Sequence, residues 1–126
     1  MANELILIVE DNPKNLKLVR DVLQVRGYRT IEAGTGEEGV QLAREQHPAL
    51  VLMDIQLPGI SGVEAFQQLR ADPATRTMPV IAVTASVMAQ ERQKVMAAGF
   101  DGFQGKPISV RELLETIRQI LDKSAQ

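Results

Sequence analysis

Three runs of consecutive apolar residues divide the chain, and each is bounded by polar or turn-forming residues: 5–9, 50–53 and 80–83. Short apolar runs without alternation are typical of strands buried on both faces of a sheet. Two weaker strands are predicted at 28–33 and 101–104. The polar content of 28–33 indicates the edge of a sheet. These patterns predict five strands.

Helix signals separate the strands. The first helix is predicted to begin at Asn12-Pro13, an N-cap followed by proline, and to end at Gly27. The fourth helix has Ser86 as its candidate cap and runs to about Ala98. The remaining three helices open with capping boxes, in which a serine or threonine precedes a glutamate by three positions: 35–38, 61–64 and 109–112.

Alternating strands and helices predict an α/β fold, in which helices cover both faces of a doubly wound, five-stranded parallel sheet. The carboxyl ends of all its strands then point to the same edge. Five polar residues lie at strand ends or just beyond them, and we expect them to share one crevice: Glu10, Asp11, Asp54, Thr84 and Lys106.

Composition narrows the classes of function. The 126 residues fit one domain, and 44% of them are hydrophobic, which is enough for a packed core. The chain has no cysteine and a single histidine, His47, so thiol catalysis, disulfides and Cys- or multi-His metal sites are excluded. A net charge of −2 without a basic block argues against direct nucleic-acid binding. No apolar run could span a membrane and the N-terminus lacks a basic region, so we expect a cytoplasmic protein.

The predicted crevice holds Glu10, Asp11 and Asp54, whose charges would repel one another. A divalent cation would neutralise them, and oxygen ligands suit Mg²⁺, or Mn²⁺ in its place. The Thr84 hydroxyl and the Lys106 ammonium complete what transfer of a phosphoryl group requires, which is charge neutralisation and positioning. Asp54 is then the candidate nucleophile, which would form an acyl phosphate.

Four short motifs follow the strands in order: Glu10-Asp11, Met53-Asp54 before Leu57-Pro58-Gly59, Thr84-Ala85, and Lys106-Pro107. Together they resemble the receiver domain of response regulators, and the resemblance covers nearly the whole chain. It implies a flavodoxin-like sheet of strand order 2-1-3-4-5 and a cis bond between Lys106 and Pro107. We expect residues 1–126 to form a single receiver domain with no output domain.

The resemblance also implies roles for single residues. Asp54 would accept a phosphoryl group from a histidine kinase or phosphotransfer protein, and Thr84 and Lys106 would contact its oxygens. The metal ligands would be Glu10, Asp11, Asp54 and the main-chain carbonyl of Gln56. The chain would then be a stand-alone response regulator that catalyses only its own phosphorylation and dephosphorylation. It would act as a monomer, or at most a weak dimer, away from membranes.

The resemblance further implies a switch of Thr84 and Phe103, although many relatives have tyrosine in place of Phe103. Phosphorylation would draw the Thr84 hydroxyl inward, and Phe103 would fill the space behind it. Met88, Arg92 and Met96 recur at helical spacing and form one row on the fourth helix. We expect a downstream protein to bind this row, Phe103 and the nearby edge of the last helix, or the phosphoryl group to be passed on.

A different function remains open from the residues alone. Positions 34–39 read G-x-G-x-x-G between a strand and a helix, a pattern that also occurs in dinucleotide-binding enzymes. Glu37 and Glu38 would repel a pyrophosphate at that helix start, whereas they suit a capped helix. A small flavodoxin-like or dinucleotide-binding enzyme is therefore the alternative to a receiver, and a purely structural module is a weaker third.

Overall fold

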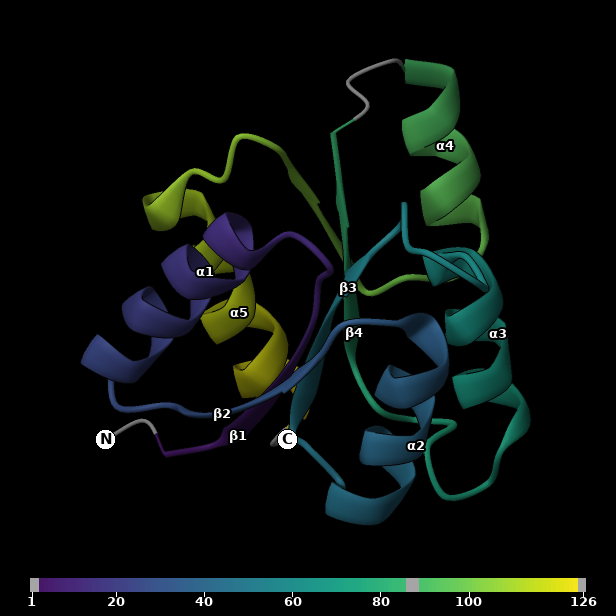
Figure 1. Ribbon diagram of the computed structural model, residues 1–126, viewed down its shortest axis with the longest axis horizontal. Coiled ribbons are helices and arrows are strands. Elements are labelled where there is room, and N and C mark those ends of the chain that lie inside the picture. Colours follow the sequence, from purple (N-terminus) through teal and green to yellow (C-terminus); the bar gives the residue numbers. More distant parts are fainter. Residues whose placement is uncertain (1–2, 86–88, 125–126) are drawn as a thin grey trace.

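The computed structural model describes residues 3–85 and 89–124, and strands and helices alternate along this part of the chain (Figure 1). The strands are β1 (Leu5–Val9), β2 (Arg29–Ala33), β3 (Leu50–Asp54), β4 (Val80–Thr84) and β5 (Gly102–Gly105). The helices are α1 (Pro13–Val25), α2 (Gly36–Gln46), α3 (Gly62–Ala71), α4 (Ala89–Ala97) and α5 (Val110–Ser124).

The strands form one five-stranded sheet in the order β2-β1-β3-β4-β5, and every pair is parallel. Both the predicted fold class and the strand order are confirmed. The polar strand β2 lies at an edge of the sheet, as its composition indicated. The order reverses direction between β1 and β3, and in open parallel sheets ligands bind beyond the carboxyl ends of the strands at such a point.

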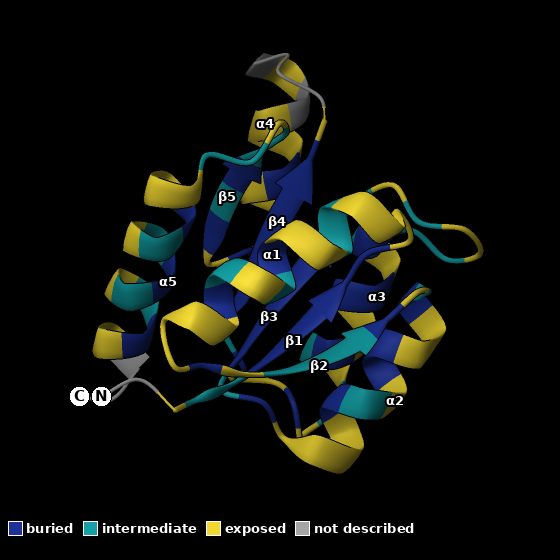
Figure 2. Cartoon of the chain, turned by 60° about the vertical axis from the view of Figure 1, so that its left-hand side comes forward, coloured by how far each residue is buried: buried dark blue, intermediate teal, exposed yellow. Residues whose placement is uncertain are grey.

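Helices cover both faces of the sheet. α1 and α5 pack on one face, and α2, α3 and α4 on the other (Figure 1). Each face has its own apolar core, so β1, β3 and β4 are buried from both sides (Figure 2). This double burial is the reason that these strands are continuous apolar runs in the sequence.

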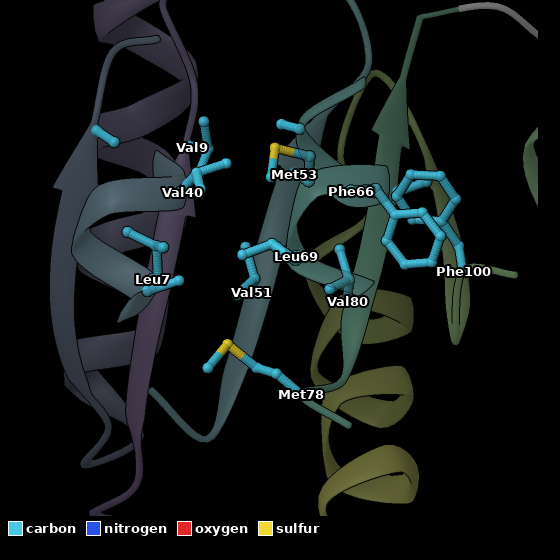
Figure 3. Close-up of a cluster of buried hydrophobic side chains, with 14 of the residues drawn as sticks. Leu7, Val9, Val40, Val51, Met53, Phe66, Leu69, Met78, Val80 and Phe100 are labelled. Atoms are coloured by element: carbon cyan, nitrogen blue, oxygen red, sulfur yellow. The ribbon is translucent and has the colours of Figure 1, made fainter. Parts of the chain in front are cut away.

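The larger core lies under α2, α3 and α4 (Figure 3). Within it, the rings of Phe66 and Phe100 stack, with centroids 4.0 Å apart and planes 19° from parallel. The Arg70 guanidinium lies 4.5 Å from the centroid of the Phe66 ring, and it also donates a 2.8 Å hydrogen bond to Asp101 Oδ2. These contacts join α3 to the segment between α4 and β5.

Most predicted helix ends are observed. The Asn12 side chain accepts hydrogen bonds at the start of α1, and Gly27 follows its end with a φ of 91°. Ser61 and Glu64 form the complete capping box of α3. At α2 the Thr35 side chain caps the helix, whereas Glu38 Oε1 accepts a hydrogen bond from Gly34 N–H, one residue before the cap.

Other boundaries differ slightly from the prediction. β5 begins and ends one residue later than 101–104, because Gly102 rather than Asp101 starts the pairing with β4. The Asp101 carboxylate instead accepts a hydrogen bond from Val80 N–H at the start of β4. The predicted cap of the fourth helix, Ser86, lies outside the described residues. That helix is described from Ala89.

Candidate functional site

Three acidic residues meet at the carboxyl edge of the sheet. Glu10 directly follows β1, Asp11 comes next, and Asp54 is the last residue of β3. Each offers a carboxylate oxygen, and these oxygens all lie within 4.8 Å of one another. Glu10 and Asp54 are only 6% and 3% exposed, whereas Asp11 is exposed. The predicted convergence of these three acids is therefore observed.

Lys106 joins two of these acids from the other side of the site. It follows β5, and its Nζ lies 2.8 Å from Asp54 Oδ2 and 2.9 Å from Glu10 Oε1. Its side chain is only 17% exposed. The peptide bond from Lys106 to Pro107 is cis, as expected. A lysine at this place is thus a half-buried counter-ion of the acids rather than a solvated loop residue.

Main-chain amides orient the remaining carboxylate oxygens. Gln56 N–H donates a 3.1 Å hydrogen bond to Asp54 Oδ1, and Asn12 N–H donates one of 3.2 Å to Glu10 Oε2. Sequence reasoning missed both donors, because a main-chain amide leaves no trace in the residue type. Turn-forming residues after each strand are the only signal that could have indicated them.

Burial and charge shift the ionisation of two of these groups. Burial raises the pKa of the Glu10 carboxyl, and the neighbouring Asp54 raises it further, so that the opposing effect of Lys106 is overcome. Burial alone would lower the pKa of the Lys106 ammonium, but its hydrogen bonds to Asp54 and Glu10 outweigh this and raise it. Lys106 therefore stays charged. A further cation beside Glu10 would stabilise the ionised form of its carboxyl group.

The residues present fit a divalent metal ion. The cluster offers carboxylate oxygens from three acids, and Lys106 pairs with two of them, Glu10 and Asp54. Hard oxygen donors of this kind suit Mg²⁺. Gln56 follows Asp54 by two residues and is exposed, which leaves it at the mouth of the same site.

Thr84 ends β4 beside this cluster and is 4% exposed. Its main-chain oxygen accepts a 2.9 Å hydrogen bond from Lys106 N–H. In the same way, the oxygen of Val83 accepts a hydrogen bond of 2.9 Å from Ile55 N–H, the residue after Asp54. The main chain of β4 thus holds the segments that carry Asp54 and Lys106 at a fixed separation.

The expected switch aromatic, Phe103, lies on β5, opposite Ala82 of β4, and is half-buried against the larger core. The Arg92 guanidinium lies over its ring, 5.0 Å from the centroid. Met96 is 42% exposed on the same helix as Arg92. Met88, the first member of the expected row, lies outside the described residues. Arg92 and Met96 are thus at the surface, and Phe103 lies next to Arg92.

The G-x-G-x-x-G segment surrounds the start of α2, and its second and third glycines, Gly36 and Gly39, are covered by protein atoms. A Cβ on Gly36 would lie 2.7 Å from Ile60 Cγ1, and one on Gly39 would lie 2.7 Å from Val9 Cγ2. Ile60 and Val9 therefore occupy the space in which a phosphate would approach these glycines. This packing argues against a dinucleotide site at the start of α2.

The fold and the acidic site define the class of protein. The family model of the response regulator receiver domain matches residues 6–118. The chain belongs to this family and acts in two-component signalling. Its resemblance to the receiver domain, predicted from the four motifs, is confirmed.

Particular relatives support the assignment. The chain is 47% identical to the polar-differentiation response regulator DivK of Brucella ovis over 116 residues, which are 92% of this chain and 94% of DivK. It is 33% identical to the receiver domain of the sensor histidine kinase PA1611 of Pseudomonas aeruginosa PAO1, with a TM-score of 0.84 and coverage of 96% of both chains. That domain was solved with a magnesium ion coordinated in its active site cleft.

A third relative is another solved receiver domain. The CheY-like receiver domain protein of Methanospirillum hungatei JF-1 is 31% identical, with a TM-score of 0.85 over 96% of this chain and 95% of that one. Because the family and these relatives are signalling proteins, the alternative of a small dinucleotide-binding enzyme is not favoured.

Across residues 3–85 and 89–124, no helix is both long and apolar enough to cross a membrane.

Proposed function

We propose that Asp54 accepts a phosphoryl group from a phosphohistidine of a histidine kinase or phosphotransfer protein, in the presence of Mg²⁺. The observation that carries the proposal is the position of Lys106, whose Nζ contacts both Asp54 and Glu10 beside the three-acid cluster. In the transfer, an oxygen of Asp54 forms a bond to phosphorus while the bond from phosphorus to the histidine nitrogen breaks.

Each group at the site has a part in this reaction. Glu10, Asp11, Asp54 and the Gln56 carbonyl would hold Mg²⁺, or Mn²⁺ in its place. The metal supplies charge neutralisation for the phosphoryl oxygens. Lys106 already donates to Asp54 Oδ2, so its ammonium is placed to stabilise negative charge there. The Gln56 amide holds Asp54 Oδ1 and thereby fixes the orientation of the carboxylate.

We propose that the signal leaves through Thr84 and Phe103. A phosphoryl group adds about −1.5 to −2 charges and three acceptor oxygens beside Thr84. Phe103 lies on the neighbouring strand, with Arg92 over its ring. Movement of the Phe103 ring would change the surface formed by α4, β5 and α5, to which Arg92 and Met96 also belong. A downstream protein would read that surface, or the phosphoryl group would pass to another protein.

We further propose that residues 1–126 act as one receiver domain, as a monomer or at most a weak dimer in the cytoplasm. The match over residues 6–118 supports a single domain, as does the 94% coverage of DivK. Any catalysis would then be limited to the protein's own phosphorylation and dephosphorylation. Neither a membrane nor nucleic acid is expected as a direct partner.

The test is the intact mass of the protein after incubation with a small phosphodonor, with and without Mg²⁺. One phosphoryl group should be added only when Mg²⁺ is present, and none to Asp54→Asn. Asp11→Ala should bind Mg²⁺ more weakly than the wild type. Asp21→Asn is the matched control, because Asp21 is an acid on α1 that pairs with Lys17 outside the site. An adduct that persists in Asp54→Asn would refute the assignment.

A further inference from the structure

The β3–α3 loop, residues 55–61, packs directly on the first turn of α2. Gly36 is the first residue of that helix and is buried. A Cβ at position 36 would lie 2.7 Å from Ile60 Cγ1 and 3.1 Å from the Ile60 carbonyl oxygen. Distances this short force the neighbouring atoms to move. The missing side chain of Gly36 is therefore what allows Ile60 to occupy its observed position.

The backbone at Gly36 does not itself require glycine. Its φ lies outside the left-handed region, unlike those of Gly27, Gly59 and Gly99. Alanine is also favoured over glycine within helices by about 1 kcal/mol. Contact with Ile60, rather than backbone conformation, thus accounts for a glycine at position 36.

The loop is held from its other side by α3. Gly62 N–H donates a 2.9 Å hydrogen bond to the Ile55 carbonyl, and a Cβ on Gly62 would overlap the main-chain oxygen of Asp54. The loop therefore lies between the first turns of α2 and α3. Displacement of Ile60 on one side would be transmitted along a short, tightly packed segment toward Asp54.

This loop carries groups of the acidic site. The Gln56 amide donates to Asp54 Oδ1 at 3.1 Å, and the Gln56 carbonyl is the proposed main-chain ligand of the metal. Only three residues separate Gln56 from Ile60. Because sites of this kind tolerate little misplacement, the contact between Gly36 and Ile60 bears directly on the geometry around Asp54.

We propose that Gly36 is a positioning residue of the acidic site, acting through Ile60 to hold the β3–α3 loop where Gln56 orients Asp54 and contributes to metal binding. The proposal rests on the proposed function for its metal ion. It gives a positioning role to the second glycine of the G-x-G-x-x-G segment and none to the first. Gly36 meets Ile60, whereas Gly34 has no atom within 4 Å of a Cβ built on it.

Gly34→Ala and Gly36→Ala form a matched pair for the test. Calorimetric titration of each protein with MgCl₂ gives its affinity for the metal, and chemical unfolding shows that each variant is folded. Residues that support a metal ligand typically contribute about 10- to 100-fold to affinity. We expect Gly36→Ala to bind Mg²⁺ about tenfold more weakly than the wild type, and Gly34→Ala to bind it equally well. In the metal-free proteins, only Gly36→Ala should shift the Gln56 amide resonance.

A compensating substitution separates positioning from general damage. Ile60→Ala removes the atoms that a side chain at position 36 would meet, so the double variant Gly36→Ala, Ile60→Ala should bind Mg²⁺ more tightly than Gly36→Ala alone. Ile60→Ala alone should also weaken binding, because the loop loses the same contact. The proposal is overturned by wild-type affinity in Gly36→Ala, by an equal loss in Gly34→Ala, or by a double variant no better than Gly36→Ala.

The outcome is distinguishable from that of the proposed function. A wild-type protein that binds Mg²⁺ but gains no phosphoryl group on Asp54 would contradict the proposed function and leave the comparison of glycine variants intact. A wild-type protein that binds no Mg²⁺ would overturn both.

Discussion

The guanidinium of Arg92 lies over the ring of Phe103, 5.0 Å from its centroid, and so joins α4 to β5. Both residues were expected at the signalling surface from the sequence, but their direct contact was not. An arginine over an aromatic ring at an exposed site contributes about 0.5–1 kcal/mol. The contact thus stabilises the half-buried position of Phe103 only modestly.

Arg92→Ala should therefore change the environment of Phe103 with little loss of stability. We expect shifted ring resonances of Phe103 by NMR and a free energy of unfolding lowered by less than about 1 kcal/mol. Gln93→Ala is the control, because Gln93 is the next exposed residue of α4. If the Phe103 ring signals stay in place when Arg92 is removed, the contact does not hold the ring.

Substitution of Lys106 should lower the free energy of unfolding, whereas substitution of its partner Glu10 should not. In metal-free protein, Lys106→Met leaves two buried carboxylates without their shared cation, and we expect a loss of about 1–3 kcal/mol. Glu10→Gln removes one negative charge while Asp54 keeps its ion pair, so unfolding should need at least as much denaturant as in the wild type. Equal losses in both variants would contradict this account of the cluster.

The pH dependence of stability should reveal the raised pKa of Glu10. Its folded-state pKa lies above the ordinary value of 4.5, so between these two values the folded state binds more protons than the unfolded state. Ionised Glu10 therefore lowers stability at neutral pH, and this cost disappears as the pH falls. We expect the free energy of unfolding of the metal-free wild type to fall between about pH 4 and 8 in part because Glu10 ionises. Glu10→Gln should remove that part of the pH dependence.

Glu4 provides a control of opposite sign. Burial alone would raise the pKa of Glu4, but hydrogen bonds from the main chain and from Arg118 outweigh it, so the pKa lies below 4.5. Its contribution to stability is therefore present above that value and is lost as the pH falls through the folded-state pKa. Glu4→Gln should lower stability at neutral pH, where Glu10→Gln does not. Identical pH profiles for the two variants would be evidence against the assigned shifts.

Gly62→Ala tests the second contact that holds the β3–α3 loop. The added methyl group would overlap the main-chain oxygen of Asp54, which cannot move without disturbing β3. We expect a loss of about 1–3 kcal/mol in the free energy of unfolding, typical of an overpacked site. Gly34→Ala should cost far less, since its methyl group meets nothing within 4 Å. Comparable midpoints of denaturation for the two variants would show that α3 can move away.

The sequence was a good guide wherever burial dictates residue type. β1, β3 and β4 are covered on both faces, so their apolar runs located them and the polar residues that follow them. Glu10 and Asp54 were found in this way. The strand order came only from the resemblance to receivers, because apolar runs do not record which strands are neighbours.

Contacts between distant segments were harder to predict. The glycine pattern at 34–39 suggested either a phosphate-binding loop or a capped turn, and the choice depends on Ile60 and Val9, which are remote in sequence. Arg118 was not singled out either, although it forms ion pairs with Glu4 and Asp122. A solvated arginine and one that joins α5 to the start of β1 look the same in sequence.

Because of Lys106, the acidic site is complete only when strands from both halves of the chain have assembled. It reaches Glu10 at the end of β1 and Asp54 at the end of β3, although β4 separates its own strand from β3. A chain in which only the first half had assembled would bring the acids together without their cation. The proposed phosphorylation of Asp54 therefore requires that β5 has docked on β4, because only then does the Lys106 ammonium reach Asp54.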